Sequence, residues 1–387
     1  MTDKYCRICG CREKKELFNL SSGLKLMGGH FPDSPSVITE CPNCGLVYVD
    51  TEANQNDFNK YYSSPNSNPF GYYELYGEKN TNKYFSDILS RFNDKITEHS
   101  EILDFAGGSG DFVKFLIEKG YKNAKNLEIS EKCKEIALKK GVDTILVDGS
   151  GDVSSYENQY DLITMIHSLE HFCDIDKVIS NSKKMLKNNG FLYIEIPDAS
   201  KYSDTNSVPY TMFTYEHLYH FTLHTLENIG NAFGLKLVKK GQFFKAESYD
   251  VIYALYQNEG VKGTVQYNSD CAISVINYNE NSAKRLRPFI KMYEETQEPI
   301  ILWGIGASTA LLLNKTFDKC NILQLIDRNK TRQGLKYKIG NKDYFVEDPS
   351  CITDKKATIV VLPYWYNESI RRQIQEMGLK NPVKGLM

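Results

Sequence analysis

Two pairs of cysteines near the start of the chain have the spacing of metal ligands. Within each pair two residues separate the cysteines, and a glycine follows directly. Each pair therefore sits on a tight turn, and two such turns bring four thiolates around one zinc ion. Four sulfur ligands leave no open coordination position, so we expect a structural zinc site within residues 1–70. The predicted ligands are Cys6, Cys9, Cys41 and Cys44.

A glycine-rich loop is the second feature that suggests chemistry. It follows an apolar strand predicted over residues 101–105 and precedes a helix predicted over 111–119. Small residues allow the backbone to approach a ligand closely at the mouth of a parallel sheet. A loop of this kind also suits a dinucleotide, so it does not identify the ligand on its own. The loop positions that we expect to contact a cofactor are Asp104, Ala106, Gly107, Gly108 and Gly110.

Acidic residues at successive strand ends decide between the possible cofactors. Asp104 ends the first strand, Glu128 ends the second, and Asp148 ends the third. Glu128 is placed to accept the ribose hydroxyls and Asp148 to accept the adenine amine. This set indicates S-adenosylmethionine rather than NAD. We also expect Ile129 and His167, which follow the second and fourth strands, to line the cofactor site.

Histidines cluster beyond the cofactor strands. Five of the seven in the chain lie between residues 167 and 224. A neutral imidazole has a pKa near neutral pH and can take a proton from a methyl acceptor. His217, beside Glu216 and Tyr215, is the stronger candidate for this base, and His171 is the second. We interpret His220 and His224 as structural.

The order of predicted elements places these residues in three units. Strands alternate with helices over residues 71–250, which predicts a doubly wound α/β sheet. A linker strand and helix follow over 251–298, with the helix at 282–296. A second α/β unit covers 299–387. Its Gly304-x-Gly306 loop and Asp327 mimic a dinucleotide fingerprint, but the third glycine is missing and we do not expect bound NAD.

Composition limits the classes of partner. The net charge of the 387-residue chain is −2, so no strong basic field favours nucleic acid or an anionic membrane. No apolar run reaches the roughly 20 residues that span a bilayer, and the first residues lack a signal-peptide pattern. Five cysteines outside the ribbon region are scattered singly, as in a reducing compartment. We expect a cytoplasmic monomer or small homo-oligomer.

These motifs resemble known families at two levels. The glycine loop and strand-end acids resemble class I S-adenosylmethionine-dependent methyltransferases, except that Ala106 replaces the first loop glycine. The chain as a whole resembles the nucleotide-sugar C-methyltransferases in the order of its three modules. The matching segments are residues 169–172 and 216–222 in the core, and 303–308, 326–330 and 361–366 in the C-terminal unit.

The narrower resemblance implies a reaction. The acceptor would be a 4-keto sugar on a nucleoside diphosphate, and His217 would remove the proton beside the ketone. The enolate would then attack the methyl group, with Glu216 orienting His217 and His171 near the sugar. The family reads Tyr-x-Glu-His, whereas this chain has Thr214 in the tyrosine position and Tyr215 one place later.

Tyrosines are the remaining candidates for substrate contacts. Tyr72, Tyr76 and Tyr219 are the ones that we assign to the substrate. The tyrosines before the core fit two roles, closing over the ligands or packing the ribbon against the core. They are Tyr61, Tyr62, Tyr72, Tyr73 and Tyr76.

Two other functions fit the same residues. An O-methyltransferase for a sugar hydroxyl in surface glycan biosynthesis needs a base but no ketone. A non-catalytic zinc-containing binding module needs neither.

Overall fold

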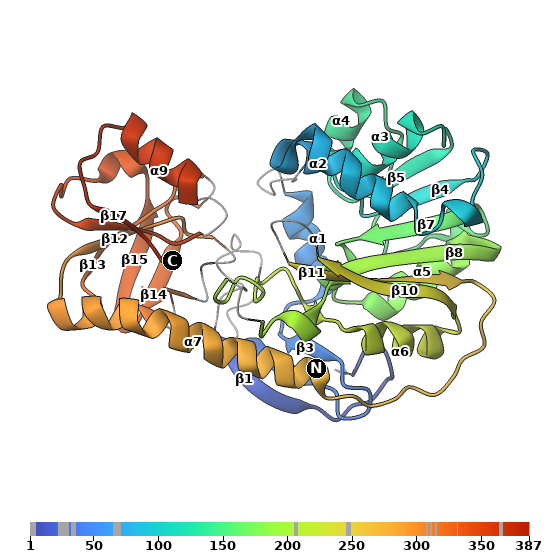
Figure 1. Cartoon of the computed structure of the whole chain (residues 1–387), viewed down its shortest axis with the longest axis horizontal. Coiled ribbons are helices and arrows are strands. Elements are labelled where there is room, and N and C mark those ends of the chain that lie inside the picture. Colours follow the sequence, from blue (N-terminus) through green and yellow to red (C-terminus); the bar gives the residue numbers. More distant parts are fainter. Residues whose placement is uncertain are drawn as a thin grey trace.

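The computed structural model arranges the chain in three sheets (Figure 1). It describes residues 5–21, 31, 36–64, 71–204, 208–244, 249–306, 309, 312–313, 316–330, 332–363 and 367–386. Figure 1 shows the seven-stranded sheet and the C-terminal sheet at opposite ends of the molecule, with helix α7 (Asp270–Thr296) running from below the C-terminal sheet to the N-terminal strands. The predicted α/β fold class is confirmed. No helix in the described ranges is long and apolar enough to cross a membrane.

The central sheet has the doubly wound order expected of the core. All its neighbouring strands are parallel except β11, which is antiparallel to both of its neighbours. The sequence pattern predicts a linker from residue 251, but strand β11, which extends to Gln257, is part of this sheet. The strand order is β10 (Lys236–Phe244), β11 (Asp250–Gln257), β8 (Leu186–Pro197), β7 (Tyr160–Ile166), β4 (Ile102–Phe105), β5 (Ala124–Glu128) and β6 (Thr144–Leu146).

Helices cover both faces of this sheet, because parallel strands are joined by crossover helices. One face packs against α2 (Tyr72–Leu89), α3 (Asp111–Glu118) and α4 (Glu131–Lys139). The other packs against α5 (Ile175–Met185) and α6 (Leu223–Phe233). The direction of strand order reverses between β4 and β7, and ligands bind such sheets in the crevice at that point.

The N-terminal sheet is not a separate ribbon. Its strands are β1 (Lys15–Ser21), β2 (Ser36–Glu40) and β3 (Val47–Asp50). The fourth strand is β9 (Tyr219–His220), which comes from the histidine segment and pairs antiparallel with β3. Helix α1 (Gln55–Ser63) then leads from β3 toward the central sheet.

The C-terminal unit is a second doubly wound sheet, as expected. Helix α7, which precedes it, begins at Asp270 rather than at the predicted residue 282, and the polar stretch 277–281 lies inside the helix. One side of the helix is buried there, at Tyr278 and at Ser282, which directly follows the stretch. Predicted positions 307–308 and 364–366 lie outside the described residues. The strand order is β14 (Lys336–Ile339), β15 (Lys342–Glu347), β13 (Ile322–Ile326), β12 (Ile300–Trp303), β16 (Thr358–Val361) and β17 (Val383–Gly385), with helix α9 (Asn367–Glu376) between the last two strands.

Candidate active site

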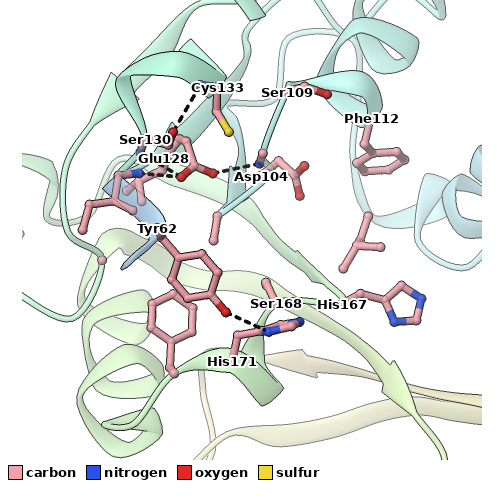
Figure 2. A pocket seen from close by; sticks show the side chains of 18 of the residues that line it. Tyr62, Asp104, Ser109, Phe112, Glu128, Ser130, Cys133, His167, Ser168 and His171 are labelled. Carbon is pink, nitrogen blue, oxygen red and sulfur yellow. Dashed lines mark hydrogen bonds between the residues drawn. The ribbon is translucent and has the colours of Figure 1, made fainter. Parts of the chain in front are cut away.

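A cavity of about 380 Å³ opens at the carboxyl edge of the central sheet. Its walls come from the glycine loop after β4, the ends of β5 and β7, the 3₁₀ turn η4 (Leu169–His171), and helices α1 and α2. Figure 2 shows Asp104, Glu128 and Ser109 on one side and His171 with Tyr62 on the other. All the sequence-predicted cofactor residues except Gly110, and part of the histidine cluster, therefore share one cavity.

The glycine loop is shaped by close contacts and left-handed backbone. A Cβ on Gly107 would lie 2.3 Å from an Oδ atom of Asp104 and 2.4 Å from Asn126 Oδ1, so only glycine fits there. Ala106 has a φ of 55°, in the left-handed region that glycine adopts without cost. A non-glycine residue in this conformation costs about 1–2 kcal/mol, which explains why glycine is usual at this position.

Glu128 ties the next strand to this loop. Its Oε1 accepts the N–H groups of Ile129 (2.8 Å) and Ser130 (3.0 Å), and its Oε2 accepts that of Gly108 (3.0 Å). Burial raises the pKa of Glu128, while the three donors oppose the shift. A carboxylate offers about four lone-pair sites, so one site on Oε2 remains for a ligand hydroxyl.

Asp104 is more strongly perturbed. The residue is 3% exposed, and burial raises its pKa to about 7 although Thr164 donates a hydrogen bond to Oδ1 at 2.7 Å. The negative charge of Glu128 adds to the shift. A cationic ligand in the cavity would favour the ionised form of Asp104.

The other predicted cofactor residues are placed as follows. Asp148 and Ile129 line the cavity, and Asn59 of α1 donates to Asp148 Oδ2 at 2.7 Å. His167 also lines the cavity, with Nε2 3.1 Å from Tyr84 Oη. Gly110 is not among the lining residues; it has a φ of 74° and precedes α3 as its N-cap.

The acceptor side of the cavity holds two facing imidazoles. The rings of His171 and His217 lie 4.9 Å apart at 83°, and Tyr62 Oη is 3.1 Å from His171 Nδ1. Burial lowers the pKa of both histidines, so both are neutral at neutral pH. Nδ1 of His217 has no hydrogen-bond partner among the described residues. His171 lines the cavity, whereas His217 is not among the lining residues and contacts the ring of His171.

Glu216 lines the same side and pairs with the preceding helix. Tyr61 of α1 donates its hydroxyl to Glu216 Oε1 at 2.7 Å. Burial and the charge of Glu216 raise the pKa of Tyr61, so the phenol keeps its proton. Thr214 accepts the Glu216 N–H at 3.5 Å, which stabilises the turn before His217. Helix α1 thus supplies phenols to both His171 and Glu216.

The N-terminal sheet holds the histidine segment in place. Val49 donates its N–H to Leu218 at 2.8 Å, and Leu218 donates to the carbonyl of Glu170 at 2.8 Å. The backbone beside His217 is therefore fixed between β3 and the turn that carries His171. The sequence contained no signal for this pairing, because the strands are about 170 residues apart.

The tyrosines predicted to contact the substrate (Tyr72, Tyr76 and Tyr219) and the predicted catalytic Tyr215 divide into two groups. Tyr72 and Tyr76 line the cavity. Tyr215 is 1% exposed and Tyr219 donates its hydroxyl to the carbonyl of Cys173 at 2.6 Å; neither is among the lining residues. Both belong to the packing around the histidine segment in this structure. Asn59 and Tyr249 line the cavity and were not predicted.

The four predicted zinc ligands converge. Cys6 and Cys44 have their sulfurs 3.5 Å apart, as do Cys9 and Cys41, and all four sulfurs lie within 4.8 Å of one another. Zinc–sulfur bonds near 2.3 Å in a tetrahedron require sulfur separations of about 3.8 Å. The cluster therefore fits a zinc ion.

Comparisons with known proteins point to one enzyme class. Residues 76–240 match a family model described as a methyltransferase domain. A demethylmenaquinone methyltransferase of Thermotoga maritima is 30% identical over 96 residues, which cover 24% of this chain and 42% of that protein. The match thus spans less than half the length of this curated relative. The chain contains a methyltransferase domain and is an enzyme.

Solved structures similar to this chain include two methyltransferases. A S-adenosylmethionine-dependent methyltransferase from Archaeoglobus fulgidus has 18% identity and a TM-score of 0.39, covering 48% of this chain and 100% of that one. One from Methanosarcina mazei has 16% identity and a TM-score of 0.38, covering 44% and 98%.

Proposed function

We propose that this enzyme transfers the methyl group of S-adenosylmethionine to a carbon of a nucleoside-diphosphate 4-keto sugar. The observation that carries the proposal is the placement of His171, Tyr61 and Tyr62 in the wall of the cavity that also holds the glycine loop, with a second neutral imidazole, that of His217, against His171. S-adenosylmethionine supplies an electrophilic methyl group when bound. Glu128 has an acceptor site for its ribose, and Asp148 has one for its adenine.

The acceptor side provides the groups that enolate chemistry requires. A ketone makes the neighbouring C–H acidic enough for a positioned base to remove its proton. His171 and His217 are neutral because of burial, and a neutral imidazole is the form that accepts a proton. In this proposal His217 is the base, the ring of His171 lies beside it and lines the cavity, and the charge of Glu216 favours an imidazolium at His171.

The phenol that the family places at position 214 has a replacement from another element. Tyr61 and Tyr62 reach Glu216 and His171 from α1. Their raised pKa values keep both phenols protonated. Tyr61 donates its single O–H to Glu216, so Tyr62 is the phenol that can donate to an enolate oxygen, when the proton on His171 lies on Nδ1. This donor favours carbon methylation over the alternative, O-methylation of a sugar hydroxyl.

Solvent exchange tests the proposal directly. The wild-type chain should exchange the proton beside the ketone of an NDP-4-keto sugar in D₂O, and should add one methyl group when S-adenosylmethionine is present. His217→Gln should slow both reactions about 100-fold or more, since a general base contributes that much. Its affinity for S-adenosylhomocysteine should not change. His171→Gln shows whether the second imidazole carries the proton instead.

Three results would overturn this assignment. If both histidine variants exchange the proton at the wild-type rate, neither imidazole is the base. Methylation of an NDP sugar without a ketone would establish the O-methyltransferase alternative. A chain that binds S-adenosylhomocysteine but methylates neither class would favour the non-catalytic binding module.

We further propose that Cys6, Cys9, Cys41 and Cys44 hold a structural zinc ion. Metal analysis of the purified chain should find one zinc per chain, and Cys41→Ser should lose it. Because β9 belongs to the ribbon sheet, loss of zinc should also disorder the histidine segment, which a drop in unfolding temperature would report. A zinc-free wild-type chain with unchanged thermal stability would contradict the assignment.

A further inference from the structure

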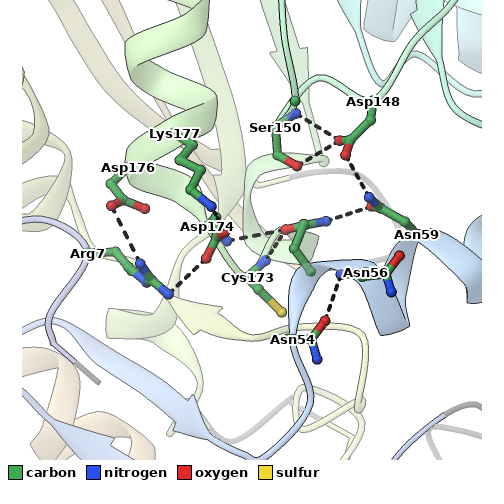
Figure 3. A network of polar contacts seen from close by, with 12 residues as sticks. Arg7, Asn54, Asn56, Asn59, Asp148, Ser150, Cys173, Asp174, Asp176 and Lys177 are labelled. Atoms are coloured by element: carbon green, nitrogen blue, oxygen red, sulfur yellow. Dashed lines mark hydrogen bonds and ion pairs between the residues drawn. The ribbon is translucent and has the colours of Figure 1, made fainter. Parts of the chain in front are cut away.

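Helix α1 connects the ribbon to the cofactor side of the cavity by a chain of side-chain hydrogen bonds (Figure 3). Asn59 lines the cavity and donates Nδ2 to Asp148 Oδ2 at 2.7 Å. One helical turn earlier, Gln55 donates Nε2 to Asn59 Oδ1 at 2.9 Å. This series of hydrogen bonds, here called the relay, therefore runs from Gln55 through Asn59 to Asp148, the acid that follows the third predicted strand.

Backbone groups fix the direction of this relay. Gln55 Oε1 accepts the N–H groups of Cys173 at 2.8 Å and Asp174 at 3.2 Å. Only the amide oxygen can accept these bonds, so the amide nitrogen must face Asn59. Asn59 must in turn present its oxygen to Gln55 and its nitrogen to Asp148. The backbone N–H groups of Cys173 and Asp174 can only donate, so they fix the orientation of both side-chain amides.

Asp148 is held from both sides as a hydrogen-bond acceptor. Its Oδ1 accepts the N–H of Ser150 at 2.9 Å and the hydroxyl of Ser150 at 2.7 Å. Oδ2 accepts from Asn59. Three donors occupy three of about four lone-pair sites, which leaves one acceptor site on Oδ2.

We infer that Asn59 is a positioning residue that makes the cavity selective for a 6-aminopurine. By holding Asp148 Oδ2 as an acceptor, it directs the remaining lone pair toward a donor such as the exocyclic amine of adenine. A 6-oxopurine presents an acceptor oxygen at that position and would be repelled. This inference rests on the proposed adenosyl cofactor.

The relay also reaches the ribbon. Asp174, whose N–H group fixes Gln55, pairs through its carboxylate with Arg7 at 2.8 Å. Arg7 lies between the ribbon cysteines Cys6 and Cys9 and is also 3.6 Å from Asp176. The ribbon turn thus anchors the loop from which the relay takes its direction.

The test compares two ligands that differ at one atom of the base. Calorimetry on the full chain would measure the affinities for S-adenosylhomocysteine and for S-inosylhomocysteine, its 6-oxo analogue. The wild type should prefer the adenosyl ligand by about 100-fold, as expected when a site binds a group by a charged hydrogen bond. Asn59→Leu should reduce this preference to about tenfold or less.

Gln55→Glu probes the direction of the relay and leaves Asn59 and Asp148 themselves unchanged, although Gln55 also lines the cavity. A glutamate still accepts the two backbone N–H groups but cannot donate to Asn59, so the Asn59 amide should turn its oxygen toward Asp148. The selectivity should then fall about as far as in Asn59→Leu. Asn56→Leu is the matched control, because Asn56 lies on the same helix with an exposed side chain, and it should keep the wild-type ratio.

The ratio of the two affinities separates positioning from a merely structural role. A general loosening of the cavity would weaken both ligands equally and leave the ratio unchanged, which would overturn the inference. Wild-type ratios in both variants would overturn it as well. Failure of the wild-type chain to bind S-adenosylhomocysteine would instead overturn the proposed cofactor, and this inference with it.

Discussion

The molecule contains two glycine loops that are alike in sequence and different in access. Each loop follows the first strand of a parallel sheet, and an acid from the next strand reaches back to a loop N–H. Glu128 accepts from Gly108 in the core, and Asp327 accepts from Ile305 at 2.9 Å in the C-terminal unit. The backbone arrangement is therefore shared.

The two loops differ in the groups that lie next to them. The core loop lines the cavity of about 380 Å³. In the C-terminal unit, Arg332 pairs with Asp327 at 3.2 Å and lies so close to Gly306 that a Cβ there would be 2.8 Å from Nη1. An arginine thus occupies the approach that a phosphate or ribose would need. The same fingerprint can serve a ligand in one unit and an internal ion pair in the other.

Neutralising the two strand-end acids should give the largest contrast. Glu128→Gln replaces an acceptor of three N–H groups and, in the proposed complex, of a ribose hydroxyl, so affinity for S-adenosylhomocysteine should fall about 100-fold. Asp327→Asn removes one of the two carboxylate oxygens that accept the N–H groups of Ile305 and Asn329, but its loop should bind no part of the ligand, and the affinity should stay within about twofold. Calorimetry measures both, and circular dichroism checks that each variant is folded.

The comparison would fail in either of two ways. If Asp327→Asn weakens the ligand as much as Glu128→Gln, the C-terminal loop takes part in cofactor binding. Binding of NAD to the wild type, lost in Asp327→Asn, would show that Arg332 moves aside and that the second fingerprint is functional.

Alanine at the matched glycines should give a smaller contrast. In Gly107→Ala the new Cβ meets two buried polar atoms, one of them on Asp104, which Thr164 holds. Overpacking of this kind costs about 1–3 kcal/mol, and we expect it as a lower unfolding temperature and weaker ligand binding. In Gly306→Ala the Cβ meets only the end of Arg332, whose side chain is 40% exposed and can move.

Thermal unfolding with and without S-adenosylhomocysteine distinguishes the two sites. Gly107→Ala should lower the unfolding temperature and reduce the stabilisation by ligand, whereas Gly306→Ala should change neither by more than a small amount. Equal losses in the two variants would mean that Arg332 is held as rigidly as Asp104.

Sequence patterns predicted the parts of this site that are local. The glycine loop, Glu128 and Asp148 follow strands that periodicity locates, so their meeting at one sheet edge follows from parallel topology. The cysteine pairs are equally local, because each turn carries its own two ligands.

Such patterns could not predict the contacts across the cavity. Tyr61 and Glu216 are 155 residues apart, and Asn59 and Asp148 are 89 apart. Each pairing depends on where α1 packs, which no spacing in the sequence records. The same reason accounts for Tyr215, predicted at the site from its neighbours but turned into the packed core by the turn at Thr214. In the C-terminal unit, the missing third glycine was the only local sign that the loop differs.

A pH dependence confined to the core loop is the smallest expected effect. Strand β12, Ile300–Trp303, carries no acid equivalent to Asp104. The pKa of Asp104 is raised to about 7, so the carboxyl is largely protonated at pH 6 and largely ionised at pH 8. S-adenosylmethionine carries positive charge and should bind better to the ionised form. Its affinity should therefore rise by about fivefold to tenfold from pH 6 to pH 8, by linkage.

Asp104→Asn supplies the control, since an amide does not titrate in this range. The variant should bind S-adenosylmethionine with an affinity that hardly changes between pH 6 and pH 8, close to the wild-type value at the lower pH. Folding stability should change in the opposite direction in the cofactor-free wild type. An acid whose folded pKa is raised destabilises the native state as it ionises, so this contribution to stability should fall as the pH rises from about 4 through 7. A wild-type affinity that is flat with pH would show that the cationic part of the ligand lies away from Asp104.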